Sequence, residues 1–275
     1  MLGVSRFTSQ YRLWHEMSGR IEPEPHKDIF DTGHAFEAAL AALWRIENPG
    51  WQLSPGEVQI ARDALGFPAL VTLDRRARRG NARRVVEFKV ARSLEDWGDE
   101  FTDEAPADYV AQVTAQMLFT GYTKHPAHLV VMGPFFRHHT YVIEYDKGIA
   151  DTIHQRCQAF YESLAGDTPP PLDDTVMTYQ TVRALHPDID GSTVEVDPEL
   201  AWRVLEYDHA TKANEACLRG AKTRLLDAMG NAQTAVCGGV KVADRRPHAR
   251  GGVACVLATK NLDQLMSTTD NESEF

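Results

Sequence analysis

The chain lacks the features that would direct it to a membrane. It has no run of roughly eighteen consecutive apolar residues, which a membrane-spanning helix needs. The first residues, MLGVSRFTSQ, have neither the basic start nor the apolar stretch of a signal peptide. We therefore expect a cytoplasmic protein with no membrane partner.

Cysteine is scarce, and the four cysteines are scattered at Cys157, Cys217, Cys237 and Cys255. They show no CxxC spacing, which argues against a zinc ribbon, and their spread argues against a disulfide framework. Plain buried or surface thiols are expected. The eleven histidines show no metal-ligand spacing, and the chain contains no internal repeat.

The chain has fewer basic than acidic residues, with a net charge of −10, but many of its arginines are close together in the sequence. An acidic stretch at 95–104 follows a cluster of six arginines within ten residues. Net charge reports solubility and steering rather than the field at one site, so this segregation is more informative than the sum. The clustered arginines are Arg75, Arg76, Arg78, Arg79, Arg83 and Arg84.

The order of hydrophobic patterns predicts an α/β core, with a mixed sheet and helices on its faces. In this interpretation the first two strands form a hairpin whose tip is at Gly80 and Asn81. The expected elements are a helix over 34–48, strands over 68–74 and 84–90, a helix over 106–120, strands over 128–132 and 140–145, and a helix over 147–165.

The proline-rich run Thr168–Asp174 marks the preferred domain boundary. We predict a first domain over 1–167, followed by a linker and loop over 168–195. A mainly helical extension over 196–266 should end in a β-hairpin of strands 236–242 and 252–259. A polar tail over 267–275 is expected to be disordered.

Within the strand 84–90, alternation places Glu87 and Lys89 on one side and the apolar residues on the other. A carboxylate and an ammonium on a largely apolar strand are costly to bury without a purpose. Asp74 ends the preceding strand and can meet Glu87 laterally. Two converging carboxylates suit Mg²⁺, a cation that prefers oxygen ligands. The simpler alternative is a solvent-facing Glu–Lys pair.

Three more polar residues lie at helical spacing in the flanking helices. Glu37 shares a stripe with Gly33, Leu40 and Trp44, so its carboxylate either reaches the rim or points into a cleft. Gln112 and Gln116 are four residues apart and lie on one helix face. Neutral amides of this kind can hold a water or a phosphate oxygen.

Together these motifs resemble the lambda-exonuclease-like, YqaJ-type viral recombinase nucleases of the PD-(D/E)XK superfamily. The resemblance covers roughly residues 2–165 and includes Leu2–Ser9, Trp97, Pro106 and Tyr109. The motifs that carry it, in order, are Gly33-His-Ala-Phe-Glu37, Thr72-Leu-Asp74, Val86-Glu87-Phe-Lys89 and Tyr109 to Gln116.

The resemblance implies a restriction-endonuclease-like mixed sheet and a magnesium-dependent, phage-type DNA exonuclease, in which Mn²⁺ can substitute. Such an enzyme would resect double-stranded DNA for recombination by single-strand annealing. It implies that Asp74, Glu87 and the main-chain carbonyl of Phe88 bind metal, and that Glu37 approaches a second ion. Lys89 would orient and help deprotonate the attacking water and stabilise charge on the phosphate, and Gln112 would support the water or the phosphate. Tyr109 is expected to pack.

For DNA contacts we expect Gln116 and the arginine-rich tip, through Arg75, Arg76, Arg78 and Arg79. A solvated hairpin is the alternative for the tip. Implied partners are double-stranded DNA, a single-strand annealing protein and further copies of the chain.

The sequence departs from the family at two positions, with Val90 in place of a small hydroxyl residue and Arg75 in place of glycine. The family segment that grips a DNA end lies upstream of this start, so hydrolysis is better supported than processive, end-dependent digestion. Two alternatives stay open: another nuclease of the superfamily, including the iron–sulfur kind, and a non-catalytic DNA-binding scaffold.

Overall fold

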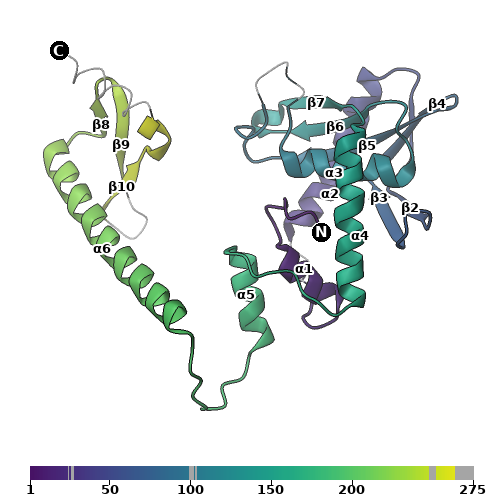
Figure 1. Ribbon diagram of the computed structural model, residues 1–275. Coiled ribbons are helices and arrows are strands. Elements are labelled where there is room, and N and C mark those ends of the chain that lie inside the picture. The colour runs from purple at the N-terminus through teal and green to yellow at the C-terminus, as the bar shows by residue number, and fades with distance from the viewer. Residues whose placement is uncertain (24, 26–27, 99–101, 103, 248–251, 264–275) are drawn as a thin grey trace. The chain divides into compact units, whose positions relative to one another are not determined.

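The computed structural model describes the chain except for residues 24, 26–27, 99–101, 103, 248–251 and 264–275 (Figure 1). The chain divides into two compact units, Met1–Ile189 and Asp190–Phe275. No helix in the described ranges has the length and apolar character needed to cross a bilayer. The predicted tail over 267–275 lies outside the described residues.

The first unit is built around a mixed five-stranded sheet in the order β1-β4-β5-β6-β7. The central pair, β5 and β6, is parallel, and the other neighbours are antiparallel. This confirms the predicted fold class of a mixed sheet flanked by helices. The strands are β1 (Gln52–Leu53), β4 (Arg75–Arg79), β5 (Ala82–Val90), β6 (Ala127–Met132) and β7 (His138–Ile143). A short 3-10 helix, Pro134–Phe136, lies between β6 and β7.

Helices cover both faces of this sheet. Helix α2 (Asp28–Glu47) packs through Leu40 and Trp44 on Val86 and Phe88 of β5. Helix α3 (Ala107–Thr120) covers the opposite face, with its Val113 and Met117 in the cluster that contains Val85 and Leu129. Because side chains alternate along a strand, β5 supplies both cores, and every residue of β6 is buried.

The chain changes sheets at Asp74, which the sequence did not predict. Strand β3 (Ala69–Leu73) pairs with β2 (Val58–Arg62) in a separate two-stranded sheet. After Asp74 the arginine-rich segment enters the main sheet as β4, and it is β4 that forms the hairpin with β5 around Gly80. The predicted direct pairing of strands 68–74 and 84–90 was therefore wrong.

Of the remaining helices of this unit, one packs beside α3 and the other two pack against each other. Helix α4 (Lys147–Ala165) contacts α3, and its bounds are those predicted. Helix α1 (Gln10–Met17) contacts α5 (Val176–Leu185), where the Thr178 hydroxyl donates to Ser9 Oγ at 2.8 Å. The segment predicted as linker and loop over 168–195 thus contains a helix, because Thr178 and Thr181 are buried against the first unit.

The second unit consists of one long helix and a three-stranded antiparallel sheet. Helix α6 (Pro198–Met229) is capped by Asp197, whose carboxylate accepts from the backbone amides of Glu199 and Leu200. The strands are β8 (Thr234–Cys237), β9 (Val240–Pro247) and β10 (Val253–Leu257), followed by a 3-10 helix, Thr259–Asn261. The predicted strand 236–242 is divided by a turn at Gly238 and Gly239, both at positive φ. The predicted hairpin is thus part of a three-stranded sheet.

Leu129 of β6 tests the packing of the main sheet, because it is fully buried in the cluster that α3 covers. We expect Leu129→Ala to lower the free energy of unfolding by about 2–5 kcal/mol, through lost apolar burial and the cavity left behind. Leu70 on β3 is 66% exposed and is the matched control. Leu70→Ala should stay within about 0.5 kcal/mol of the wild type in urea denaturation. Equal effects of both changes would contradict this packing.

Candidate active site

The sheet change at Asp74 brings this residue beside β5. In the β4–β5 register Arg75 pairs with Val86, so Asp74 is level with Glu87. The Asp74 carboxylate is oriented by the main chain, since the backbone N–H of Phe88 donates to its Oδ2 at 2.7 Å. The predicted lateral meeting of Asp74 and Glu87 is therefore present, although β4, and not the strand that ends before Asp74, forms the hairpin with β5.

Glu87 is the most constrained polar residue of the site. It is only 1% exposed, and its two carboxylate oxygens accept three hydrogen bonds. Oε1 accepts from Lys89 Nζ and from Gln112 Nε2, both at 2.6 Å. Oε2 accepts from Gln116 Nε2 at 2.8 Å, and the same amide also donates to the Thr72 carbonyl at 3.1 Å. The helix face predicted for the two glutamines thus points at Glu87.

Lys89 is held as a cation next to this carboxylate. Its Nζ also lies 5.4 Å from the centre of the Tyr109 ring, a cation–π distance. Burial on its own lowers the pKa of Lys89, but the Glu87 carboxylate and then Asp74 favour the ammonium, and the net effect raises the pKa. Tyr109 itself packs against Trp97, with ring centres 5.2 Å apart, as expected for a packing residue.

Burial and the proximity of the two acids raise the pKa of Asp74. Burial raises its pKa most, repulsion from Glu87 adds to this, and the result is a pKa of about 7. The hydrogen bond from Phe88 and the charge of Lys89 oppose the shift without cancelling it. The site therefore has more negative charge than its own residues neutralise, and an added cation would be stabilised there.

Glu37 approaches the same region from α2 and is partly buried. Its Oε2 lies 3.8 Å from Arg75 Nη1, and its Oε1 lies 4.0 Å from His34 Nε2. Burial is the main cause that raises the pKa of Glu37, while His34 and Arg75 partly oppose it. The structure thus links Glu37 to the other acids through Arg75 rather than by a direct contact.

The predicted DNA-binding arginines separate into two environments. Arg75 is only 8% exposed and also donates to the main-chain carbonyl of Asp74, so it belongs to the site rather than to the hairpin surface. Arg76 is half-buried. Arg78 and Arg79 are exposed near the tip, where Arg78 Nε donates to Gln52 Oε1 at 2.9 Å and the Arg79 guanidinium lies 4.9 Å from the Trp51 ring centre.

The donor set fits a magnesium ion bound with the help of substrate. Across the described ranges, no three His, Cys, Asp or Glu side chains lie close enough together to hold a metal ion. Mg²⁺, however, commonly uses one or two carboxylates and completes its shell with water and substrate phosphate. Asp74 and Glu87 supply such a pair, and the excess of negative charge around them favours a cation.

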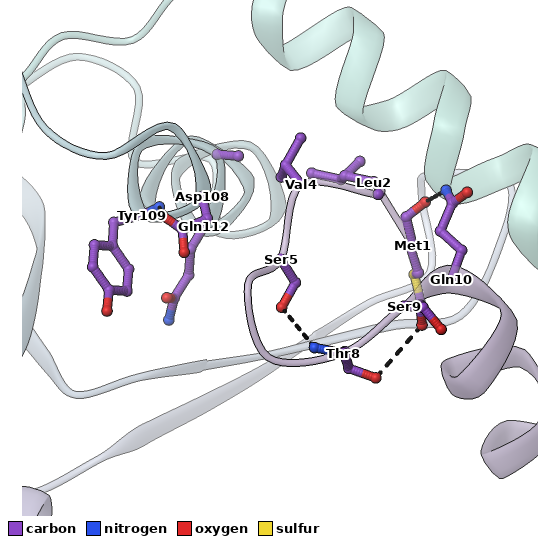
Figure 2. Close-up of a pocket in the computed structure, with 12 residues that line it drawn as sticks. Met1, Leu2, Val4, Ser5, Thr8, Ser9, Gln10, Asp108, Tyr109 and Gln112 are labelled. Atoms are coloured by element: carbon purple, nitrogen blue, oxygen red, sulfur yellow. Dashed lines mark hydrogen bonds between the residues drawn. The ribbon is translucent and has the colours of Figure 1, made fainter. Parts of the chain in front are cut away.

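A pocket of about 270 Å³ lies between the N-terminal segment and the start of α3 (Figure 2). Figure 2 shows Tyr109 and Gln112 extending from α3 on one side, with Ser5 and Thr8 of the N-terminal segment across from them. Gln112 lines this pocket and also binds Glu87, so the pocket and the acidic site share a side chain.

The N-terminal segment is fastened to α3 by an ion pair that sequence reasoning missed. Arg6 Nε donates to Asp108 Oδ2 at 3.0 Å, and its guanidinium lies 5.3 Å from the Tyr109 ring centre. The only available signal was the resemblance of residues 2–9 to the early segment of the family. Charge pairing across 102 positions leaves no periodic trace in the sequence.

The N-terminal part of the chain is similar to one known protein family. Residues 1–123 match the family model of the YqaJ-like viral recombinase domain. The match falls on the family that the motifs resemble and covers less than half of the 275 residues. No curated protein matches the chain.

Two solved structures show distant likeness. The crystal structure of SSO0001 is 14% identical, covers 68% of this chain and 82% of its own, and has a TM-score of 0.39. A protein from Eubacterium rectale, assigned provisionally as an exonuclease, is 10% identical, covers 70% and 79% respectively, and also has a TM-score of 0.39.

Repulsion between the two acids is directly testable in the metal-free protein. We expect Glu87→Gln to lower the pKa of Asp74 from about 7 toward its ordinary value, because the nearest negative charge is removed. Glu37→Gln is the control and should lower it less, since Glu37 is the weakest of the contributing charges. Carboxyl-carbon NMR titration measures both. An unchanged Asp74 in Glu87→Gln would refute this electrostatic account.

Proposed function

We propose that the first unit is a magnesium-dependent deoxyribonuclease, an exonuclease that hydrolyses phosphodiester bonds of double-stranded DNA. One observation carries the proposal. The buried Glu87 carboxylate accepts hydrogen bonds from the side chains of Lys89, Gln112 and Gln116. Asp74 lies beside it, oriented by a main-chain hydrogen bond. A purely structural ion pair would not need a second, partly buried acid whose pKa is raised to about 7. The match of residues 1–123 to a viral recombinase domain supports the same conclusion.

In this proposal Asp74 and Glu87 hold Mg²⁺, with the main-chain carbonyl of Phe88 as a further ligand and Glu37 near a second ion. Mn²⁺ is the expected substitute. The bound metal supplies an activated water and neutralises charge on the phosphate. Water oxygen bonds to phosphorus as one P–O ester bond breaks, and a proton passes to the departing oxygen.

The other side chains orient the reactants. Lys89 is positively charged and lies within the site, so it orients the attacking water and stabilises negative charge that develops on the phosphate. Gln112 reaches both Glu87 and the pocket, which suits it to support the water or the scissile phosphate. Gln116 is buried and holds Glu87 and the Thr72 carbonyl, so we assign it to positioning in preference to the DNA contact expected from the sequence.

DNA binding is assigned to the exposed part of the β4–β5 hairpin. Arg78 and Arg79 lie near the tip and can neutralise phosphates, whereas Arg75 is buried and forms an ion pair with Glu37. Resection by such an enzyme would expose single strands, so a single-strand annealing protein is the proposed partner. Assembly of several copies around DNA is a further expectation from the family.

Digestion of linear and closed-circular duplex DNA tests the activity and its type. We expect Mg²⁺-dependent loss of linear DNA, abolished by chelator, and a fall of about a hundredfold or more in Lys89→Met and Glu87→Gln. Matched controls are Lys147→Met and Asp151→Asn, which remove an exposed Lys–Asp pair on α4 and should retain full activity.

Full cutting by Glu87→Gln would reject the assigned site. Cutting of closed circles would replace the exonuclease by an endonuclease while leaving the site intact. Duplex binding without cutting under any divalent ion would favour the non-catalytic scaffold. Far-UV circular dichroism confirms that each variant is folded, so lost activity is not mistaken for lost structure.

The proposed phosphate contacts of the hairpin arginines predict how their removal changes the salt dependence of duplex binding. The double variant Arg78→Ala/Arg79→Ala should weaken duplex binding, and each lost phosphate contact should lower the slope of log K against log salt by about 1. Binding is measured by fluorescence anisotropy with Ca²⁺ in place of Mg²⁺. Arg183→Ala on α5 is the control and should leave the slope unchanged. A double variant with the wild-type slope would place the DNA elsewhere.

A further inference from the structure

Helix α6 has a long surface that its own unit leaves uncovered. Residues 202–219 are exposed without interruption, and within this unit the helix contacts β8 next to its C-terminal end. A helix gains most of its stability from packing an apolar face, and residues 202–219 of α6 have no such packing within their own unit. The large exposed apolar side chains are Leu200, Trp202, Val204, Leu205, Tyr207 and Leu218.

Part of this surface follows a heptad pattern. Starting at Leu200, nine positions are separated alternately by four and three residues, and seven of them are apolar. We call these positions the α6 seam. Its members are Leu200, Val204, Tyr207, Thr211, Asn214, Leu218, Ala221, Leu225 and Ala228. A spacing of 3.5 residues keeps such a stripe facing one neighbouring helix along its whole length.

We propose that the α6 seam pairs with the same seam of a second copy of this chain, in a parallel, in-register coiled coil. The charges beside the seam favour this arrangement. In a parallel pair Arg203 of each helix meets Asp208 of the other, which gives two opposite-charge contacts. An antiparallel pair centred between Ala213 and Asn214 would instead bring Arg203 against Arg224 of the other helix. The present intrahelical partners, Glu199 and Lys212, form exposed pairs that exchange at little cost.

The centre of the seam adds a register signal. Asn214 lies at its midpoint and would face Asn214 of the second copy, where the two amides can hydrogen-bond. A polar residue at such a position weakens a coiled coil but penalises shifted registers, which would bury the amide against apolar neighbours. Thr211 and two alanines weaken the seam further, so the association is expected to be modest.

Charge also argues against nucleic acid as the occupant. The helix contains five acidic and five basic residues and has no net charge with which to attract phosphates. The acidic set is Glu199, Glu206, Asp208, Glu215 and Asp227, and the basic set is Arg203, Lys212, Arg219, Lys222 and Arg224. Apolar pairing with a copy of the same helix is the partner chemistry that this surface fits.

Two substitutions of adjacent exposed residues test the seam on the full-length protein. Val204 is in the seam and is 59% exposed, and Leu205 lies outside it and is 70% exposed. We expect a concentration-dependent dimer in sedimentation velocity, weakened at least about tenfold by Val204→Glu, which places two carboxylates in the contact. Leu205→Glu should leave the dimer unchanged. Circular dichroism establishes that both variants keep their helix.

A wild-type protein that stays monomeric at all accessible concentrations overturns the proposal, as does an equal loss of dimer in both variants. The orientation is tested by Leu200→Cys, with exposed Cys217 and Cys237 replaced by Ser. A parallel pair predicts a disulfide-linked dimer under glutathione disulfide, and an uncrosslinked dimer would refute it. The inference is independent of nuclease activity. Val204→Glu should show the same DNA digestion as the wild type, whether or not the wild type digests DNA.

Discussion

Burial of the Glu87 carboxylate is the constraint on which the first unit depends. An ionised acid removed from water must be compensated locally, and here the compensation comes from a lysine on the same strand and two amides on α3. Helix α3 must therefore lie on this face of β5, with its glutamines pointing at the sheet. The arrangement satisfies Glu87 but leaves Asp74 beside it undercompensated. The remaining imbalance is what makes the site receptive to a divalent cation.

Features governed by short-range periodicity were predicted correctly from the sequence. Alternation along β5 placed Glu87 and Lys89 on one face, and helical spacing brought Gln112 and Gln116 together. The limits of α4 also agree with the prediction, and its start is marked locally by Asp146 as the N-cap. These signals lie within a few residues of what they determine, so tertiary contacts do not change them.

Features that depend on distant pairing were missed. The sequence placed the arginines of β4 in a hairpin tip that contacts DNA. In the structure β4 pairs with β5 on one side and with β1 on the other, and Arg75 is buried toward α2. Helix α5, which follows the proline-rich run, was not predicted because it is stabilised by α1, through a contact across 169 positions of the sequence. The roles of the site residues rest on chemistry that a fold alone does not establish.

The hydrogen bond from Phe88 to Asp74 comes from the peptide group and not from the aromatic ring. The identity of residue 88 is therefore unconstrained by this contact, and any amino acid with an amide hydrogen would preserve the carboxylate's orientation. Proline alone lacks that hydrogen. Sequence drift at this position can follow the packing needs of α2 while the geometry of the neighbouring acid stays the same, which separates two evolutionary pressures acting on one residue.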